Sequence, residues 1–378
     1  MKICIDARPV QNSNRVRGIG VLIGKLLQSM GQIDKCDEFV LITQHGHEFT
    51  PYFDKEERIV TVRPERPNRF NWIADHFFLP GLVRKSRADV FLATDFNSYV
   101  VSLPRAKVIS FVYDVIPLIF PEVMAEQPLS IKIGWPLNFN KLAKSDHIIT
   151  ISAATRDDIV KVLGIPRERI SVVYPGIDHG CFNPVTALNE SALRRLRHRF
   201  AIEGSYFIYV GDTDWRKNLR RVLAAHALLA KDVKLLLIGK RALHDRVLHD
   251  WIVEFALEGR VVLTGFVPEE DLPPLYGGAL ALLFPSIYEG FGFPVAEAMA
   301  CGCPVITANV SSLPEVAGGA AILVNPEMIG EIVAAMEQII TDISLRSRMS
   351  QAGICQAAKF SWDRCATEVL AVLKKVAG

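Results

Sequence analysis

Three things are scarce in this 378-residue chain: an excess of charge of one sign, long apolar runs and cysteines in ligand-like spacing. Its 43 basic and 41 acidic side chains leave a net charge of +2, so bulk electrostatics do not favour nucleic-acid binding. No uninterrupted apolar run approaches the ~20 residues of a membrane span, although the mean hydropathy of +0.22 is high. Asp6 and Arg8 interrupt any signal-peptide core at the start. These absences predict a soluble, cytoplasmic protein whose membrane contact would be peripheral, at the inner face of the plasma membrane.

The seven cysteines are scattered, and only Cys301 and Cys303 lie close together. A single intervening residue is not a usual zinc-ligand spacing. We therefore expect reduced thiols that behave as small buried hydrophobic side chains.

What the chain does contain is a repeated alternation of short β-branched runs with helical patterns, which indicates βα units and parallel sheets. The runs are continuously apolar, as expected for strands covered by helices on both faces. The predicted strands are Lys2–Ile5, Phe39–Ile42, Asp89–Leu92, Val108–Val112, His147–Ile151, Ile170–Val173, Tyr206–Val210, Lys234–Ile238, Val261–Leu263, Ala281–Phe284, Pro304–Thr307 and Ala321–Val324.

The length and the punctuation of the chain predict two doubly wound α/β domains. Prolines and a glycine between Tyr174 and Pro184 mark the boundary, so we assign residues 1–180 to one domain and 181–360 to the other. Residues 361–378 form a final helix that either completes the second domain or crosses back to the first. Because ligands of such sheets bind beyond the carboxyl ends of the strands, a cleft between the domains is the expected site.

The segment from Pro285 to Gly302 combines a buried strand, a glycine-rich turn and a helix start at Pro294. The backbone N–H groups of Gly290, Phe291 and Gly292 can approach an anion, and the helix adds the positive end of its dipole. Glu297, one turn into the helix, suits a grip on ribose hydroxyls, and Glu289 can reach sugar hydroxyls beside the phosphates. Taken singly, Glu297 could be a helix-dipole partner and Glu289 a solvated turn residue; their shared turn favours function.

A second turn, from Gly211 to Asn218, follows the strand Tyr206–Val210 and carries two adjacent cations. Arg216 can bind phosphate oxygens as a planar fork, and Lys217 adds a point charge. A departing diphosphate needs fixed cations beside it. Cations at a helix N-terminus are otherwise unfavourable, so their position indicates an anionic partner rather than two solvated side chains.

These motifs resemble the retaining GT-B glycosyltransferases of family 4. The resemblance rests on Arg216-Lys-Asn218, on Glu289-Gly-Phe-Gly-Phe-Pro-Val-Ala-Glu297 with its Ala-Met-Ala-Cys-Gly-Cys-Pro-Val continuation, and on the linker-like Tyr174–Asp178 and Phe182–Pro184. It implies a GT-B fold, with two Rossmann-like domains facing a cleft and a last helix crossing back to the first domain. It also implies that Arg216 and Lys217 bind the donor diphosphate, Glu297 the ribose and Glu289 the transferred sugar.

In the first half, Gly18, Gly20 and Gly24 mimic a dinucleotide-binding fingerprint, but the long segment after the first strand excludes the tight turn it requires. The resemblance makes Gly18 and Gly20 a loop near the donor phosphates and the acceptor, before a helix predicted over Val21–Met30. The simpler alternative is that these glycines only open the helix.

Asp114 follows the strand Val108–Val112, and the resemblance makes it a residue for a sugar hydroxyl or for the acceptor's proton. Many relatives place a histidine before this aspartate, whereas this chain has Tyr113. As an alternative, Asp114 could cap the next turn.

Asp212-Thr-Asp214 has the D-x-D spacing of metal-dependent transferases, but it lies in the turn whose basic residues already offset phosphate charge. We therefore predict that no metal and no other cofactor is required. The aromatic and basic segment from Asn68 to Arg87 could form a membrane-surface helix, although a core helix before the strand Asp89–Leu92 is the favoured interpretation.

The Tyr113–Leu118 stretch resembles bacterial mannosyltransferases that build surface polysaccharides such as O-antigen from GDP-mannose. The resemblance implies a nucleotide-sugar donor and a lipid-linked or oligosaccharide acceptor. UDP-sugar donors stay open, because the base pocket expected near Gly265–Val267 and Leu272 carries no readable code. A nucleotide-sugar epimerase or a phosphorylase on the same scaffold, or a non-catalytic subunit of polysaccharide assembly, are the alternatives.

Overall fold

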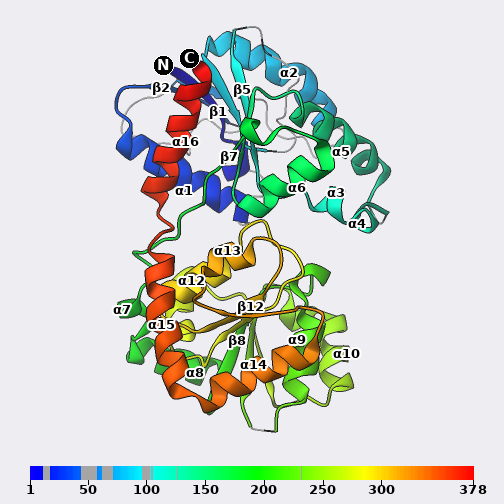
Figure 1. Cartoon of the computed structure of the whole chain (residues 1–378), viewed down its shortest axis with the longest axis vertical. Helices are drawn as coiled ribbons and strands as arrows, with labels where there is room; N and C mark the ends of the chain where they lie inside the picture. The colour runs from blue at the N-terminus through cyan, green and yellow to red at the C-terminus, as the bar shows by residue number, and fades with distance from the viewer. Residues whose placement is uncertain are drawn as a thin grey trace. The chain divides into compact units, whose positions relative to one another are not determined.

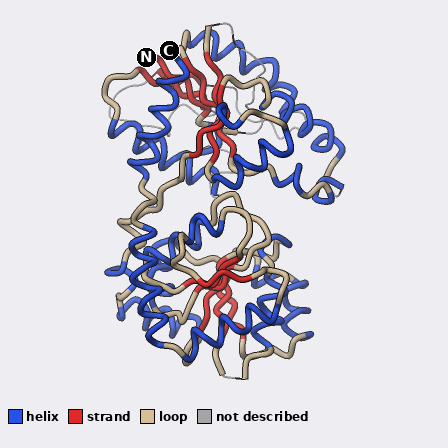
Figure 2. Tube along the Cα trace, viewed as in Figure 1, coloured by secondary structure: helices blue, strands red, loops and turns tan. Residues whose placement is uncertain are grey.

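The computed structural model describes residues 1–11, 18–43, 58–61, 71–95, 103, 105–125, 127–230 and 232–378. The chain divides into two compact units. Unit 1 comprises Met1–Gly176 together with Trp362–Gly378, and unit 2 comprises Ile177–Ser361. In each unit the strands gather at the centre and helices surround them (Figures 1 and 2). Both units are Rossmann-like α/β domains, in agreement with the predicted fold class.

Unit 1 is built on a parallel sheet of seven strands in the order β3-β2-β1-β4-β5-β6-β7. Its strands are β1 Lys2–Asp6, β2 Glu38–Thr43, β3 Arg58–Thr61, β4 Val90–Ala93, β5 Lys107–Val112, β6 His147–Thr150 and β7 Ile170–Val172. Its helices are η1 Arg8–Val10, α1 Gly18–Ile33, α2 Asn71–Ser86, α3 Ile116–Ile119, α4 Glu122–Ala125, α5 Leu129–Leu142, α6 Ala153–Leu163, η3 Arg167–Arg169 and α16 Trp362–Ala377.

The last helix, α16, is part of unit 1 and packs along α1 (Figure 1). Its apolar side, including Val369 and Leu373, is buried. Polar contacts fix the two ends: the Ser29 hydroxyl bonds to the Asp363 carboxylate at 2.5 Å, and Lys374 Nζ lies 2.9 Å from Asp34 Oδ2. The final helix of the sequence therefore completes the first domain.

Unit 2 is built on a parallel sheet of six strands in the order β10-β9-β8-β11-β12-β13. Its strands are β8 Tyr206–Val210, β9 Lys234–Ile238, β10 Val261–Gly265, β11 Leu282–Phe284, β12 Val305–Ala308 and β13 Ile322–Val324. Its helices are α7 Pro184–Ala187, α8 Glu190–Phe200, η4 Trp215–Lys217, α9 Leu219–Ala227, η5 Ala242–His244, α10 Arg246–Glu254, η6 Glu269–Asp271, α11 Leu272–Gly277, α12 Phe293–Ala300, α13 Leu313–Ala317, α14 Ile329–Thr341 and α15 Ile343–Ala357.

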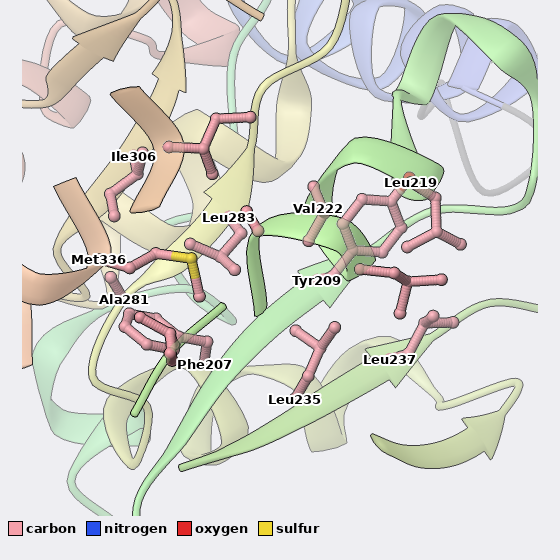
Figure 3. Packing of buried hydrophobic residues seen from close by; sticks show 14 of the residues in the cluster. Phe207, Tyr209, Leu219, Val222, Leu235, Leu237, Ala281, Leu283, Ile306 and Met336 are labelled. Atoms are coloured by element: carbon pink, nitrogen blue, oxygen red, sulfur yellow. The ribbon is translucent and has the colours of Figure 1, made fainter. Parts of the chain in front are cut away.

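The core of unit 2 fills the space between this sheet and the helices α9 and α14 (Figure 3). Side chains from neighbouring strands, such as Phe207, Leu235 and Leu283, are completely buried beside Val222 of α9 and Met336 of α14. Continuous burial along the strands explains why they read as unbroken apolar runs rather than alternating ones. The result is a rigid base for the loops at the carboxyl ends of the strands.

The segment considered as either a membrane-surface helix or a core helix falls on α2 and on residues before it. Residues 68–70, and the side chains of the aromatic residues at 72, 77 and 78, lie outside the part that the structure describes. In the described part, Leu79 and Val83 are buried in the core while Arg84 and Lys85 are exposed, which agrees with the core-helix interpretation. None of the helices in the described residues is both long enough and apolar enough to span a bilayer.

Candidate functional site

The carboxyl ends of β8 and β11 lie side by side at the centre of the unit 2 sheet. The two strands pair in parallel, and the chain order reverses between them, since β9 follows β8 on one side and β12 follows β11 on the other. Such a reversal separates the loops above the sheet and creates the place where α/β proteins bind ligands. Both motifs singled out in the sequence, Gly211–Asn218 and Pro285–Gly302, start at this point.

The turn after β8 holds Arg216 and Lys217 in the 3-10 helix η4. Its start is capped by Asp214, whose Oδ1 accepts a bond from the Arg216 N–H at 3.0 Å. From below, the hydroxyl of the buried Tyr209 donates to the Lys217 carbonyl at 3.1 Å. The backbone that carries both cations is therefore fixed to the core of the sheet.

Asn218 ends this turn and connects it to two other loops. The residue is buried and has a left-handed backbone with φ of 58°. Its amide Nδ2 donates to the carbonyl of Pro285 at 2.9 Å and to that of Pro326 at 2.6 Å, and its Oδ1 accepts from Arg221 at 3.0 Å. Asn218 thus sets the distance between the loops after β8, β11 and β13.

Two further contacts join the cation turn to the glycine-rich loop. The Ile287 N–H donates to the Arg216 carbonyl at 2.7 Å, and Lys217 Nζ lies 2.6 Å from Glu289 Oε1. The ammonium also lies 4.8 Å from the centre of the Phe284 ring, where a cation is attracted to the ring face. The side chains of Lys217 and Glu289 are only 21% and 10% exposed, so this charge-assisted bond is shielded from bulk water. Arg216, Lys217 and Glu289 therefore form one cluster.

The glycine-rich loop turns at Gly292, which precedes α12 with φ of 106°. This positive φ favours glycine, and a Cβ there would lie 2.7 Å from Leu313 Cδ2 and would displace that buried side chain. No side chain caps α12. Pro294 has no N–H, and the Val295 N–H already donates to the Gly292 carbonyl at 3.0 Å, so a further acceptor would meet the backbone at Gly292 and Phe293. The Ser312 hydroxyl, bonded to the carbonyls of Glu289 and Phe291 at 2.9 and 2.8 Å, fixes the loop.

Phe291, predicted as part of the ligand cradle, points its ring into the protein. The ring is 2% exposed and packs edge-on against Phe293 and Phe360, with ring centres 5.2 Å apart in each case. Only the backbone of Phe291 can therefore serve a ligand. Gly290 is half-buried beside it.

Glu297 lies on α12 in an environment separate from the cation cluster. Its carboxyl is half-buried, and the hydroxyl of the buried Tyr276 donates to Oε2 at 3.4 Å. Burial, and secondarily the nearby Glu269 carboxylate, raise the pKa of Glu297 to about 8. A carboxyl held partly protonated in this way is an acceptor and donor for hydroxyl groups, which is the chemistry that ribose presents.

A pocket of about 210 Å³ opens beside Gly211, at the ends of β8, β9 and β10. Its lining includes the residues at which the sequence placed a base pocket, Gly265–Val267 and Leu272. The backbone here is tightly packed, because a Cβ on Gly239 would lie 2.5 Å from the Gly211 carbonyl oxygen. Phe266, 67% exposed, stands at the rim and offers an aromatic face.

The remaining predicted site residues belong to unit 1. Gly18 and Gly20 lie in the first turn of α1, which starts three residues before the predicted Val21; the prediction that they form a loop ahead of the helix is wrong. Glycine is tolerated there because first-turn N–H groups have no intrahelical partner to lose. Asp114 Oδ1 accepts from the Ile116 N–H at 3.1 Å, which is the capping contact considered as its alternative role. Tyr113, in place of histidine, donates its hydroxyl to the Thr94 carbonyl at 2.8 Å.

The D-x-D aspartates have protein partners. Asp212 Oδ1 accepts from the Arg241 N–H at 3.1 Å, and Asp214 contacts Arg216. Within the described ranges, no group of three or more His, Cys, Asp or Glu side chains is arranged to hold a metal ion.

Sequence reasoning missed the residues that assemble the site rather than line it. Asn218 was predicted only as a member of the Arg216–Asn218 motif, with no role of its own. Ser311, whose hydroxyl accepts from the Glu289 N–H at 3.0 Å, was not predicted as a site residue. A polar residue in an otherwise apolar βα unit was the available signal for both. Their partners are far away in the sequence, so the signal does not say what they bind.

Comparison with known families accounts for both units. A model described as Glycosyltransferase Family 4 matches residues 16–180, and one described as Glycosyl transferases group 1 matches residues 195–355. Together the two matches span most of the chain. The chain therefore belongs to the GT-B glycosyltransferases that join a family 4 domain to a group 1 domain, and the resemblance of the motifs to family 4 GT-B enzymes is confirmed.

Among characterised relatives, O-antigen chain mannosyltransferase B of Escherichia coli is 36% identical over 233 residues, or 60% of this chain and 60% of that protein. Serotype-specific mannosyltransferase WbdA of Escherichia coli is 26% identical over 288 residues, or 71% of this chain and 34% of that protein. The chain thus spans less than two thirds of the length of either relative.

Solved structures extend the likeness over the whole chain. Sucrose-phosphate synthase from Thermosynechococcus elongatus has a TM-score of 0.75 at 18% identity, covering 100% of this chain and 99% of that one. Anabaena HepE in complex with UDP-glucose has a TM-score of 0.74 at 17% identity, covering 98% and 100%. At such identities the likeness establishes the fold.

Proposed function

We propose that the protein is a retaining mannosyltransferase that transfers mannose from GDP-mannose to a lipid-linked saccharide during surface polysaccharide synthesis. The observation that carries the proposal is the cluster in which Lys217 meets Glu289 and Arg216 meets Ile287 across the two loops. The choice of sugar and of process is supported by the O-antigen mannosyltransferase at 36% identity. A lipid-linked acceptor would bring the enzyme to the inner face of the plasma membrane.

In the proposed reaction, the bond between the sugar and the diphosphate breaks with the leaving group held by Arg216, Lys217 and the N–H groups around Gly292. These donors offset the negative charge that grows on the diphosphate, which is the effect that lowers the barrier. Retention follows if the acceptor oxygen attacks from the face that the diphosphate leaves. Because two fixed cations already stand beside the phosphates, we propose that no metal ion is needed.

Glu289 has two roles in this scheme. Without donor, its carboxylate holds the Lys217 ammonium over the Phe284 ring. With donor bound, a phosphate oxygen can replace Glu289 as a partner of the Lys217 ammonium, and the Glu289 carboxylate can then accept a hydrogen bond from a sugar hydroxyl. The exchange keeps the shielded ammonium compensated throughout, which matters because an uncompensated charge in such a place is costly.

The direct test is incubation of the protein with GDP-mannose, UDP-glucose and other nucleotide sugars plus lipid-linked acceptors, with the product analysed by mass spectrometry and its anomeric configuration by NMR. We expect mannose transfer from GDP-mannose with the configuration kept, unaffected by EDTA. Replacing Arg216 and Lys217 by alanine should lower turnover by about 100- to 1000-fold. The matched control is Arg220→Ala, which removes an exposed cation paired with Glu254.

Each other outcome identifies a different activity. Transfer from UDP-glucose would refute the donor assignment. An epimerised nucleotide sugar formed without acceptor would refute transfer itself. Unchanged turnover in the Arg216, Lys217 double variant would refute the proposed leaving-group contacts.

A further inference from the structure

Asp214 is the part of the D-x-D segment for which neither the sequence motifs nor the proposed chemistry supplies a role. It lies two residues before Arg216, at the start of η4. Its two carboxylate oxygens contact two different nitrogens of the Arg216 guanidinium: Oδ1 accepts from Nε at 3.1 Å and Oδ2 accepts from Nη2 at 3.1 Å. This is the parallel, two-bond geometry in which a carboxylate fixes the plane of a guanidinium.

The carboxylate is itself fixed, because the turn anchors it. The same Oδ1 accepts from the Arg216 N–H at 3.0 Å, and the Asp214 carbonyl accepts from the Lys217 N–H at 2.9 Å. The Ile287 contact holds the Arg216 carbonyl on the opposite side. Asp214 therefore fixes the guanidinium at the end of the Arg216 side chain relative to the backbone of the turn.

Orientation matters more here than stability. The Asp214 side chain is 41% exposed, and an ion pair at such a site adds little to folding. A free arginine side chain, however, loses substantial rotamer entropy when it is fixed on a ligand, and a guanidinium already held in plane loses less. The bonds to Asp214 use the edge formed by Nε and Nη2, and they fix the plane of the guanidinium.

We propose that Asp214 is a positioning residue that orients the Arg216 guanidinium for the diphosphate of the nucleotide donor. The assignment rests on the proposed function, because it presumes that Arg216 meets a phosphate. It also gives the D-x-D segment a role in arginine orientation rather than in metal binding.

The opposite hypothesis makes a prediction of opposite sign. If Asp214 only occupied Arg216 in place of a phosphate, removing the carboxylate would free the cation and strengthen diphosphate binding. If Asp214 orients Arg216, removing it weakens binding.

The test is a double-mutant cycle between Asp214→Ser and Arg216→Ala, with GDP and UDP as probes and affinities measured by calorimetry. Serine keeps a capping oxygen for η4 but cannot hold a guanidinium in two places. We expect Asp214→Ser to weaken binding of the preferred nucleotide about fivefold or more, and to add less than about twofold once Arg216 is alanine. Asp342→Ser, which removes a capping carboxylate at α15 in the same domain, is the matched control and should leave affinity nearly unchanged.

The outcomes separate this assignment from the proposed function. Equal losses from Asp214→Ser with and without Arg216 would reduce Asp214 to a structural cap and overturn the proposal. Wild-type affinity or tighter binding in Asp214→Ser would overturn it as well, while leaving the donor site intact. Failure of the wild-type protein to bind either nucleotide would refute the proposed function, and the assignment with it.

Discussion

Replacing Glu297 by glutamine should stabilise the protein, and by more at neutral than at acidic pH. The reason is the pKa of Glu297, which burial and then the Glu269 carboxylate raise to about 8 from an ordinary value of 4.5. Between these two values the folded protein keeps a proton that the unfolded chain has released. Because the unfolded chain ionises first, the free energy of unfolding falls progressively as pH rises from about 4.5 to 8. A neutral glutamine of the same shape does not titrate and avoids that loss.

The magnitude follows from the pKa gap at 1.36 kcal/mol for each pH unit. The advantage of Glu297→Gln should be about 1 kcal/mol at pH 5 and about 3 kcal/mol at pH 7. Both values are upper limits, because the side chain is half-buried and solvent screens part of the effect. The 3.4 Å contact with the Tyr276 hydroxyl can be kept by the glutamine oxygen.

Thermal unfolding of the nucleotide-free protein measures this difference, with roughly 2–4 °C expected for each kcal/mol in a domain of this size. The melting-temperature gain should thus be larger at pH 7 than at pH 5 by up to roughly 4–8 °C. The exposed Glu254→Gln serves as the control and should show no such trend. An equal gain at both pH values would refute the reasoning. If Glu297 also binds ribose as a carboxylate, the same variant should lose the stabilisation that a bound nucleotide confers.

Substitutions at two further residues probe the core of unit 2 and the loops around the site. The His226 ring is fully buried, neither ring nitrogen has a hydrogen-bond partner among the described residues, and burial followed by the Arg260 charge lowers its pKa to about 4. The free energy of unfolding of the wild type should fall by about 2 kcal/mol from pH 7 to pH 5, since the unfolded chain takes up the proton first. In urea unfolding, His226→Leu should lack this part of the pH dependence. Parallel pH dependences of wild type and variant would contradict the prediction. Asn218→Ala should lose about 1–3 kcal/mol by leaving the Pro285 and Pro326 carbonyls unpaired. Asn218→Gly, which accepts the positive φ, should recover only the part of the lost stability that comes from backbone strain. Equal stability of Asn218→Ala and wild type in urea would contradict the proposed role.

The strands were predictable because their signal is local. Every predicted strand is present, with each end at most two residues from its predicted position, since a buried parallel strand is recognised by its own apolar run. The exception is β3, Arg58–Thr61, which was missed. Its apolar run is limited to Ile59 and Val60, and it is defined by parallel pairing with β2, a partner that so short a run does not indicate.

The site was predictable where a side chain's chemistry is unusual for its position, and not where its partner is distant. Two adjacent cations before a helix, and two carboxylates around glycines, stand out in any sequence. The 2.6 Å contact of Lys217 with Glu289 joins residues 72 positions apart, and the bond from Asn218 to Pro326 spans 108. Such contacts depend on the order of the strands, which apolar runs do not reveal.

That order also explains how the protein keeps two cations together before any ligand arrives. Like charges fixed side by side repel each other, most strongly where water is excluded. Here each cation has its own carboxylate, Asp214 for Arg216 and Glu289 for Lys217. One carboxylate comes from the same turn and the other from the loop of the neighbouring strand, so the second bond forms only when β8 and β11 pair. Folding of the sheet and compensation of the site's charge are therefore one event, so the diphosphate of the proposed donor would meet cations that are already in place.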